Sequence, residues 1–111
     1  MGGGLFAIFF LLMVGHAVAD YALQSSELSE TKRRAKNPGG WWMALGAHAL
    51  IHGGAVTLVL GSPLLGFFEF VAHFCIDFGR CEGKYSYKVD QFLHVLCKVL
   101  WIVFFLLGIH Y

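Results

Sequence analysis

Four apolar stretches dominate the sequence, and each is close to the length that crosses a lipid bilayer. A helical span needs about 20 mostly apolar residues, because a helix rises about 1.5 Å per residue through a hydrocarbon core of about 30 Å. The stretches cover residues 4–24, 41–60, 63–78 and 90–110. They predict an all-α fold, a four-transmembrane-helix bundle that forms a single integral membrane domain over residues 1–111.

The composition agrees with a surface that faces lipid. Hydrophobic residues make up 58% of the chain and charged residues 14%, against roughly 45–50% and about 25% in soluble domains. A chain of 111 residues cannot bury eleven Phe, three Trp and four Tyr side chains in a soluble core. The net charge of +1 provides no basic face for phosphates, so nucleic acid is not an expected partner and the lipid bilayer is.

Positive charges lie in only two of the segments between the apolar stretches. Residues 25–40 contain four Lys and Arg residues and residues 79–89 contain three, whereas the other connection and both chain ends have none. The positive-inside rule therefore places these two segments in the cytoplasm and both termini outside. Both segments are polar, and the first ends in Asn-Pro-Gly-Gly, so they are predicted to be loops.

Each apolar stretch carries ionisable or amide side chains that are four residues apart. This spacing puts the members of a set on one face of a helix. The sets are His16, Asp20 and Gln24; His48 and His52; Glu69, His73 and Asp77; and Asp90, His94 and Lys98. Counted from the cytoplasmic ends, all four sets fall in the same half of the bilayer. The bundle is therefore expected to have a polar interior in its cytoplasmic half.

Histidine and carboxylate side chains prevail in these sets, and this favours a metal site over a network of interhelical hydrogen bonds. An ionisable residue in the bilayer costs about 2.5–3.5 kcal/mol, so these groups must neutralise one another or a shared ion. Imidazole and carboxylate groups suit Zn²⁺ best here, with Mn²⁺ and Fe²⁺ as alternatives. The expected ligands are His16, Asp20, His48, His52, His73, Asp77 and His94. They exceed the four or five that one ion needs, so one ion and two ions both stay open.

The remaining polar residues of the sets receive supporting roles. Gln24 and Gln91 are expected to hydrogen-bond to the ligands, and Lys98 to act as a counter-ion. In a catalytic site, Glu69 or Asp90 is expected to act as the general base.

Four ordered motifs contain most of these side chains. They are His16-x-x-x-Asp20-Tyr21-x-x-Gln24, His48-x-x-x-His52, His73-x-x-x-Asp77 and Asp90-Gln91-x-x-His94. Together they resemble the family catalogued as domain of unknown function 3307. The resemblance covers most of the chain and implies a small membrane protein of bacteria or their phages, hence the bacterial inner membrane, but it implies no reaction. The family usually has a Lys soon after the Asp of the third motif, and Arg80 and Lys84 are the candidates here.

Three classes of function stay open. The first is a metal-dependent hydrolase that acts on a lipid-linked or membrane-embedded substrate, and the His-rich helices are distantly similar to those of membrane-bound metal-dependent hydrolases. The second is a transporter or channel for protons or metal ions, although little that is ionisable continues into the outer half. The third is a phage or bacterial membrane factor without enzymatic activity that binds host membrane proteins. Self-association as a homo-oligomer is left open.

Overall fold

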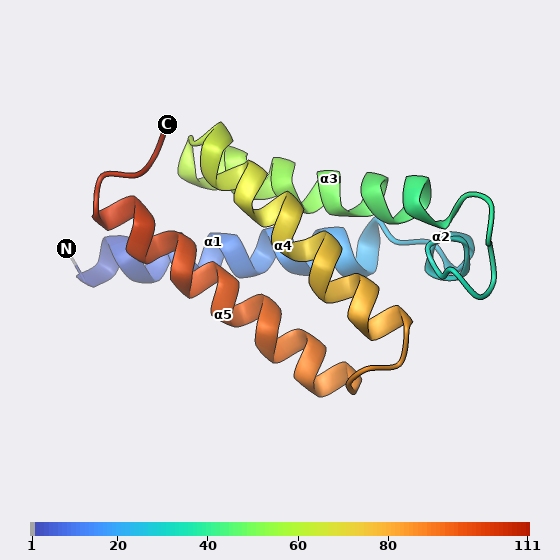
Figure 1. Cartoon of the computed structure of the whole chain (residues 1–111). Helices are drawn as coiled ribbons and strands as arrows, with labels where there is room; N and C mark the ends of the chain where they lie inside the picture. Colours follow the sequence, from blue (N-terminus) through green and yellow to red (C-terminus); the bar gives the residue numbers. More distant parts are fainter. Residues whose placement is uncertain (1) are drawn as a thin grey trace.

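The computed structural model of the chain describes residues 2–111, with side chains from residue 4 onward (Figure 1). Its elements in chain order are α1 (Gly2–Ala17), the π-helical turn η1 (Val18–Ala22), α2 (Ser26–Thr31), α3 (Trp41–Leu60), α4 (Pro63–Cys81) and α5 (Tyr87–Leu106). The described part of the chain contains no strand, so the predicted all-α fold is confirmed. The helix α3 coincides with the second predicted stretch, and α1 together with η1, α4 and α5 begin and end within four residues of the other predicted bounds.

The prediction of a loop over residues 25–40 is wrong in one place, because α2 forms there. The Ser25 hydroxyl accepts a hydrogen bond from the Leu28 backbone N–H at 3.0 Å, which caps the start of the helix. Glu27 in the first turn adds a negative charge at the positive end of the helix dipole. These local signals outweigh the polar composition of the segment.

The helices α3 and α4 form a tight antiparallel hairpin (Figure 1). Gly61 ends α3 with a φ of 63°, in the left-handed region that favours glycine, and Ser62 caps the start of α4. The two helices approach closely at Gly53 and Gly66, since a Cβ added to Gly53 would lie 2.7 Å from the Gly66 carbonyl oxygen. Small residues at this crossing let the polar faces of α3 and α4 meet directly.

The molecule measures 46 × 26 × 22 Å, and α4 and α5 run obliquely to α1 and α3 (Figure 1). Both chain ends lie at one end of the molecule, and α2 and the connection from α4 to α5 lie at the other (Figure 1). Three segments are long and apolar enough to cross a membrane: Gly4–Ala22, Trp41–Leu60 and Tyr87–Leu106. The helix α4 is more polar, because it carries Glu69, Asp77 and Arg80.

The interior is more polar than the surface, the reverse of the arrangement in water-soluble proteins. Among the described residues, eleven polar or charged residues are buried, against eight hydrophobic ones. Large apolar side chains such as Phe6, Leu58 and Phe92 are exposed, and they occur on all four long helices. The buried apolar cluster, which contains Leu12, Leu65 and other residues, packs in the half of the bundle nearer the chain ends. Such a surface suits a lipid environment better than water.

Candidate metal centre

Five histidine side chains from four helices meet inside the bundle. They are His16 of α1, His48 and His52 of α3, His73 of α4 and His94 of α5, and none is more than 4% exposed. The ring centroids of His52 and His73 lie 3.6 Å apart, and those of His73 and His94 lie 4.3 Å apart. The four-residue spacing of the sequence motifs thus corresponds to helix faces that converge.

Four of the expected ligands lie close enough together to hold one metal ion. Asp20, His48, His52 and His73 each offer one ligand atom, and these atoms all lie within 4.8 Å of one another. We call these four residues the ligand group. The Asp20 Oδ1 atom lies 3.2 Å from the Nε2 atoms of both His48 and His52. Asp77 lies at the edge of the group, with its Oδ2 atom 3.7 Å from His48 Nε2.

The π-helical turn η1 contains Asp20, so this ligand does not sit on a regular α-helix. The Leu23 N–H donates to the Val18 carbonyl oxygen five residues earlier, at 2.9 Å, which widens the turn. Turns of this kind are common at functional sites, because they reorient a side chain without ending the helix.

Glu69 is fully buried and all of its hydrogen-bonding partners are side chains. Its Oε1 atom accepts hydrogen bonds from Lys98 Nζ at 2.8 Å and from Trp101 Nε1 at 2.9 Å. Its Oε2 atom lies 3.2 Å from His73 Nδ1. A carboxylate that holds one ring nitrogen of a histidine leaves the other nitrogen free to bind a metal. Glu69 also lies with His73 and His94 in a second group of potential ligands, but both of its oxygens already have partners.

Five buried side-chain atoms in the described chain have no hydrogen-bond partner within the protein. They are His16 Nδ1, His48 Nδ1, His73 Nε2, Asp90 Oδ1 and His94 Nδ1. An unsatisfied buried polar group is rare, because it loses its hydration without compensation. The free His73 Nε2 atom is on the side of the ring opposite its contact with Glu69 and lies 4.0 Å from Asp77 Oδ2. The centre therefore has nitrogen and oxygen atoms available to bind a metal ion.

Gln91 links the ligand group to the residues of α5. Its Nε2 atom donates to Asp20 Oδ2 at 3.1 Å and to Asp90 Oδ2 at 3.0 Å, and its Oε1 atom lies 3.0 Å from His16 Nε2. His94 Nε2 lies 3.3 Å from Asp90 Oδ1. His94 thus lies beside Asp90, and His16 lies beside the ligand group with its Nε2 atom 3.5 Å from Asp20 Oδ2, but neither histidine is a member of that group.

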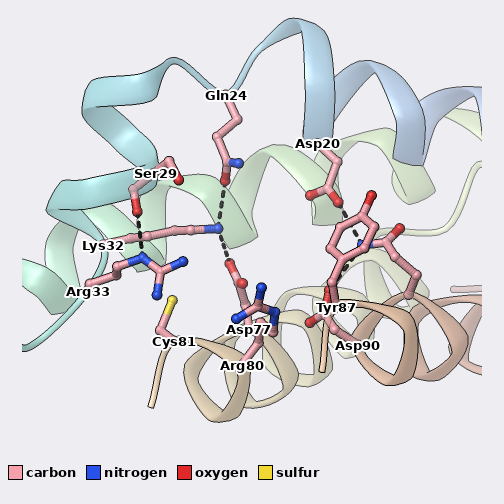
Figure 2. Close-up of a pocket in the computed structure, with 11 residues that line it drawn as sticks. Asp20, Gln24, Ser29, Lys32, Arg33, Asp77, Arg80, Cys81, Tyr87 and Asp90 are labelled. Atoms are coloured by element: carbon pink, nitrogen blue, oxygen red, sulfur yellow. Dashed lines mark hydrogen bonds and ion pairs between the residues drawn. The ribbon is translucent and has the colours of Figure 1, made fainter. Parts of the chain in front are cut away.

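Lys32 is the main residue of the centre that the sequence did not single out. It was interpreted as part of a cytoplasmic positive cluster, but it is only 6% exposed and its Nζ atom donates to Asp77 Oδ2 at 2.8 Å (Figure 2). The same ammonium group donates to Gln24 Oε1 at 2.6 Å, so Gln24 supports Lys32 and, within the described residues, makes no hydrogen bond to an expected ligand. Ser25 could have indicated the position of Lys32 from the sequence, because it caps the helix that brings Lys32 back to the bundle.

A polar cavity of about 180 Å³ opens beside the ligand group, between η1 and α2 on one side and α4 and α5 on the other (Figure 2). Asp20, Asp77 and Asp90 are among the residues that line it. The cavity lies toward the end of the bundle that carries α2, so it connects the centre with that end of the molecule.

The fold and the centre define a class of small all-helical proteins with an apolar exterior and a buried histidine–carboxylate cluster. The chain belongs to the family described as "Protein of unknown function (DUF3307)", which it matches over residues 8–110. This match confirms the resemblance seen in the four sequence motifs. No curated protein and no solved structure matches the chain.

Proposed function

We propose that this chain is a four-span membrane protein that binds one divalent metal ion and uses it to hydrolyse a membrane-borne substrate. The observation that carries the proposal is the set of unpartnered buried atoms around the ligand group, above all His73 Nε2. Hydrogen bonds between helices would leave few such atoms, whereas a metal ion accepts an imidazole nitrogen and a carboxylate oxygen directly.

The polar residues of α4 lie on one face of the helix and the apolar residues on the other. This distribution supports the crossing of the membrane by α4 together with the other three long helices. Glu69, His73 and Asp77 are buried on its inner face, and Phe67 and Val71 are exposed on its outer face. Nineteen residues at about 1.5 Å each are close to the thickness of a hydrocarbon core. With four spans, the two segments that carry the positive charges lie on the same side of the membrane, and this side is proposed to be the cytoplasmic one.

Formal charges favour one divalent ion over two. Asp20, Glu69, Asp77 and Asp90 carry four negative charges, and Lys32 and Lys98, buried beside Asp77 and Glu69, cancel two of them. Among these carboxylates and the two buried lysines a charge of −2 remains, which one divalent cation neutralises; the half-buried Arg33 and Arg80 are not part of this count. Because charge in the bilayer interior is costly, a second divalent ion would need its own anions. Three imidazoles and one carboxylate make a donor set that suits Zn²⁺.

The contacts of Glu69 favour a positioning role over the role of general base. Both of its oxygens are engaged, by Lys98 and Trp101 on one side and by His73 on the other. Asp90 is the better candidate for the base, because it lines the cavity, which Glu69 does not, and because its neighbours are Gln91 and His94 rather than a lysine. A bound divalent ion would supply an activated water near neutral pH, and Asp90 would accept its proton.

Elemental analysis of the protein purified in detergent without chelators tests the proposal directly. We expect about one divalent ion per chain, with zinc prevailing, because of the charge balance and the donor set. Two ions per chain would contradict the charge argument alone. Protein that binds no divalent ion even after dialysis against zinc would contradict the metal site and leave the polar interior with a structural role.

Cysteine labelling in intact cells tests the orientation. In a background without native cysteines, Lys36→Cys and Lys84→Cys are expected to react only after the cytoplasm is made accessible. Pro63→Cys and Tyr111→Cys are expected to react with a membrane-impermeant maleimide from outside, because both positions are exposed. The reverse pattern would place the polar cavity at the outer face and contradict the proposed orientation.

A further inference from the structure

Two arginine side chains line the cavity without an anionic partner. Within the described residues, the Arg33 side chain makes one hydrogen bond, from its Nε atom to the Ser29 carbonyl oxygen at 3.3 Å. The Arg80 side chain makes no ion pair and no hydrogen bond with these residues. Both residues are half-buried. The neighbouring Arg34 differs, because it lies outside the cavity and pairs with Glu82 at 2.5 Å.

The cavity brings these guanidinium groups to the same space as the carboxylates of the centre. Figure 2 shows Arg33 and Arg80 beside Lys32 and Asp77, with Asp20 and Asp90 farther along the same cavity. Its volume of about 180 Å³ is far above the roughly 10–15 Å³ that one water molecule needs. A small group that enters from the α2 end therefore meets the arginines and the metal-binding carboxylates in one place.

The charges that line the cavity favour an anionic group. With one divalent ion, the four carboxylates and the two buried lysines are neutral, so Arg33 and Arg80 leave a charge of +2 at the cavity. A phosphate monoester carries a charge of about −1.5 to −2 near neutral pH, and its oxygens fit the planar donor pattern of arginine. A neutral ester or amide would leave both guanidinium groups without a counter-charge.

We propose that the cavity binds the phosphoryl group of a phosphate monoester, which makes phosphate monoesters the substrate class of the hydrolase. This inference rests on the proposed metal-dependent function. In the reaction, the oxygen of one water joins phosphorus, the ester P–O bond breaks, and the alcohol leaves with a proton while inorganic phosphate is released. Arg33 and Arg80 hold the phosphoryl oxygens, and Asp90 takes the proton of the attacking water.

Titration with inorganic phosphate, the product of such a reaction, tests the inference on zinc-loaded protein in phosphatidylcholine nanodiscs. Arg33→Gln and Arg80→Gln are each expected to raise the Kd for phosphate at least tenfold, because each removes a charge-assisted contact. Arg34→Gln removes the same charge from the same end of the molecule and is expected to change the Kd less than twofold. The zinc content of all three variants is expected to equal that of the wild type, since no arginine belongs to the ligand group.

The same measurements separate failure of this inference from failure of the proposed function. Zinc-loaded wild-type protein that does not bind phosphate, or a loss of affinity in Arg34→Gln as large as in Arg33→Gln, would overturn the substrate class alone. Protein that takes up no metal would overturn the proposed function. Nanodiscs that also contain phosphatidic acid identify the source of the phosphoryl group: competition with phosphate supports a lipid monoester, and its absence supports a soluble one.

Discussion

The variant His73→Ala is expected to lose metal binding and thermal stability together. His73 lies at the middle of the centre, where Glu69 holds its Nδ1 atom and its Nε2 atom is unpartnered. Without the imidazole, the ligand group loses one of four donors, and we expect metal affinity to fall at least 100-fold. Because a bound ion stabilises the folded state by RT ln(1 + [L]/Kd), a 100-fold loss of affinity removes about 2.7 kcal/mol at saturating metal.

Thermal denaturation in detergent, with and without added zinc, measures this effect. Zinc is expected to raise the Tm of the wild type and, at the same concentration, to raise the Tm of His73→Ala by clearly less. His110→Ala is the matched control, because His110 lies beyond α5, near the chain end, with its ring beside those of Phe105 and Tyr111 and outside the ligand group. An equal zinc-dependent rise in Tm for His73→Ala and the wild type would contradict the proposed ligand role of His73.

The variant Lys98→Met is expected to produce the largest loss of stability in the protein. Lys98 is 1% exposed, and among the described residues its ammonium group pairs only with Glu69, which is itself fully buried. Removal of one member of a buried ion pair leaves the other charge uncompensated and typically destabilises a protein by about 3–5 kcal/mol. Methionine keeps most of the volume of the lysine stem, so the loss reports on charge more than on packing.

The double variant Glu69→Gln/Lys98→Met separates charge from shape. It removes both charges, so we expect it to be at least about 2 kcal/mol more stable than Lys98→Met alone. Lys84→Met, which replaces a loop lysine without a recorded ion pair, is expected to change stability by less than about 0.5 kcal/mol. A Lys98→Met protein as stable as the Lys84→Met control would show that Glu69 is not held as a carboxylate by Lys98.

Periodicity was enough to predict the faces that form the centre. His48 and His52 lie four residues apart on α3, and His73 and Asp77 do the same on α4, so each pair had to lie on one helix face. A helix face with charged groups cannot face lipid, hence the faces had to turn toward each other. The bounds of α3 followed from its apolar run in the same way.

Residues from irregular segments were not predictable in this way. Lys32 follows a short helix in a polar segment, and no helical period relates it to Asp77, which is 45 residues away in the chain. Trp101 was missed although it lies three residues after Lys98, because an aromatic residue in an apolar run gives no sign that its N–H meets a buried carboxylate. The π-helical turn at Asp20 depends on one added residue per turn, which a pattern of apolar residues does not reveal.

The number of metal ions illustrates how local and tertiary information differ. The sequence determines that histidines and carboxylates share helix faces in an apolar chain, because the spacing of residues along a helix is a property of the backbone. The sequence left one metal ion and two metal ions open, because the charge of the centre depends on which lysine side chains are buried beside its carboxylates. Only the packing of α2 against the bundle brings Lys32 to Asp77, and only the crossing of α4 and α5 brings Lys98 to Glu69. These contacts join residues far apart in the chain, and their energy comes from burial that exists only after the helices have packed.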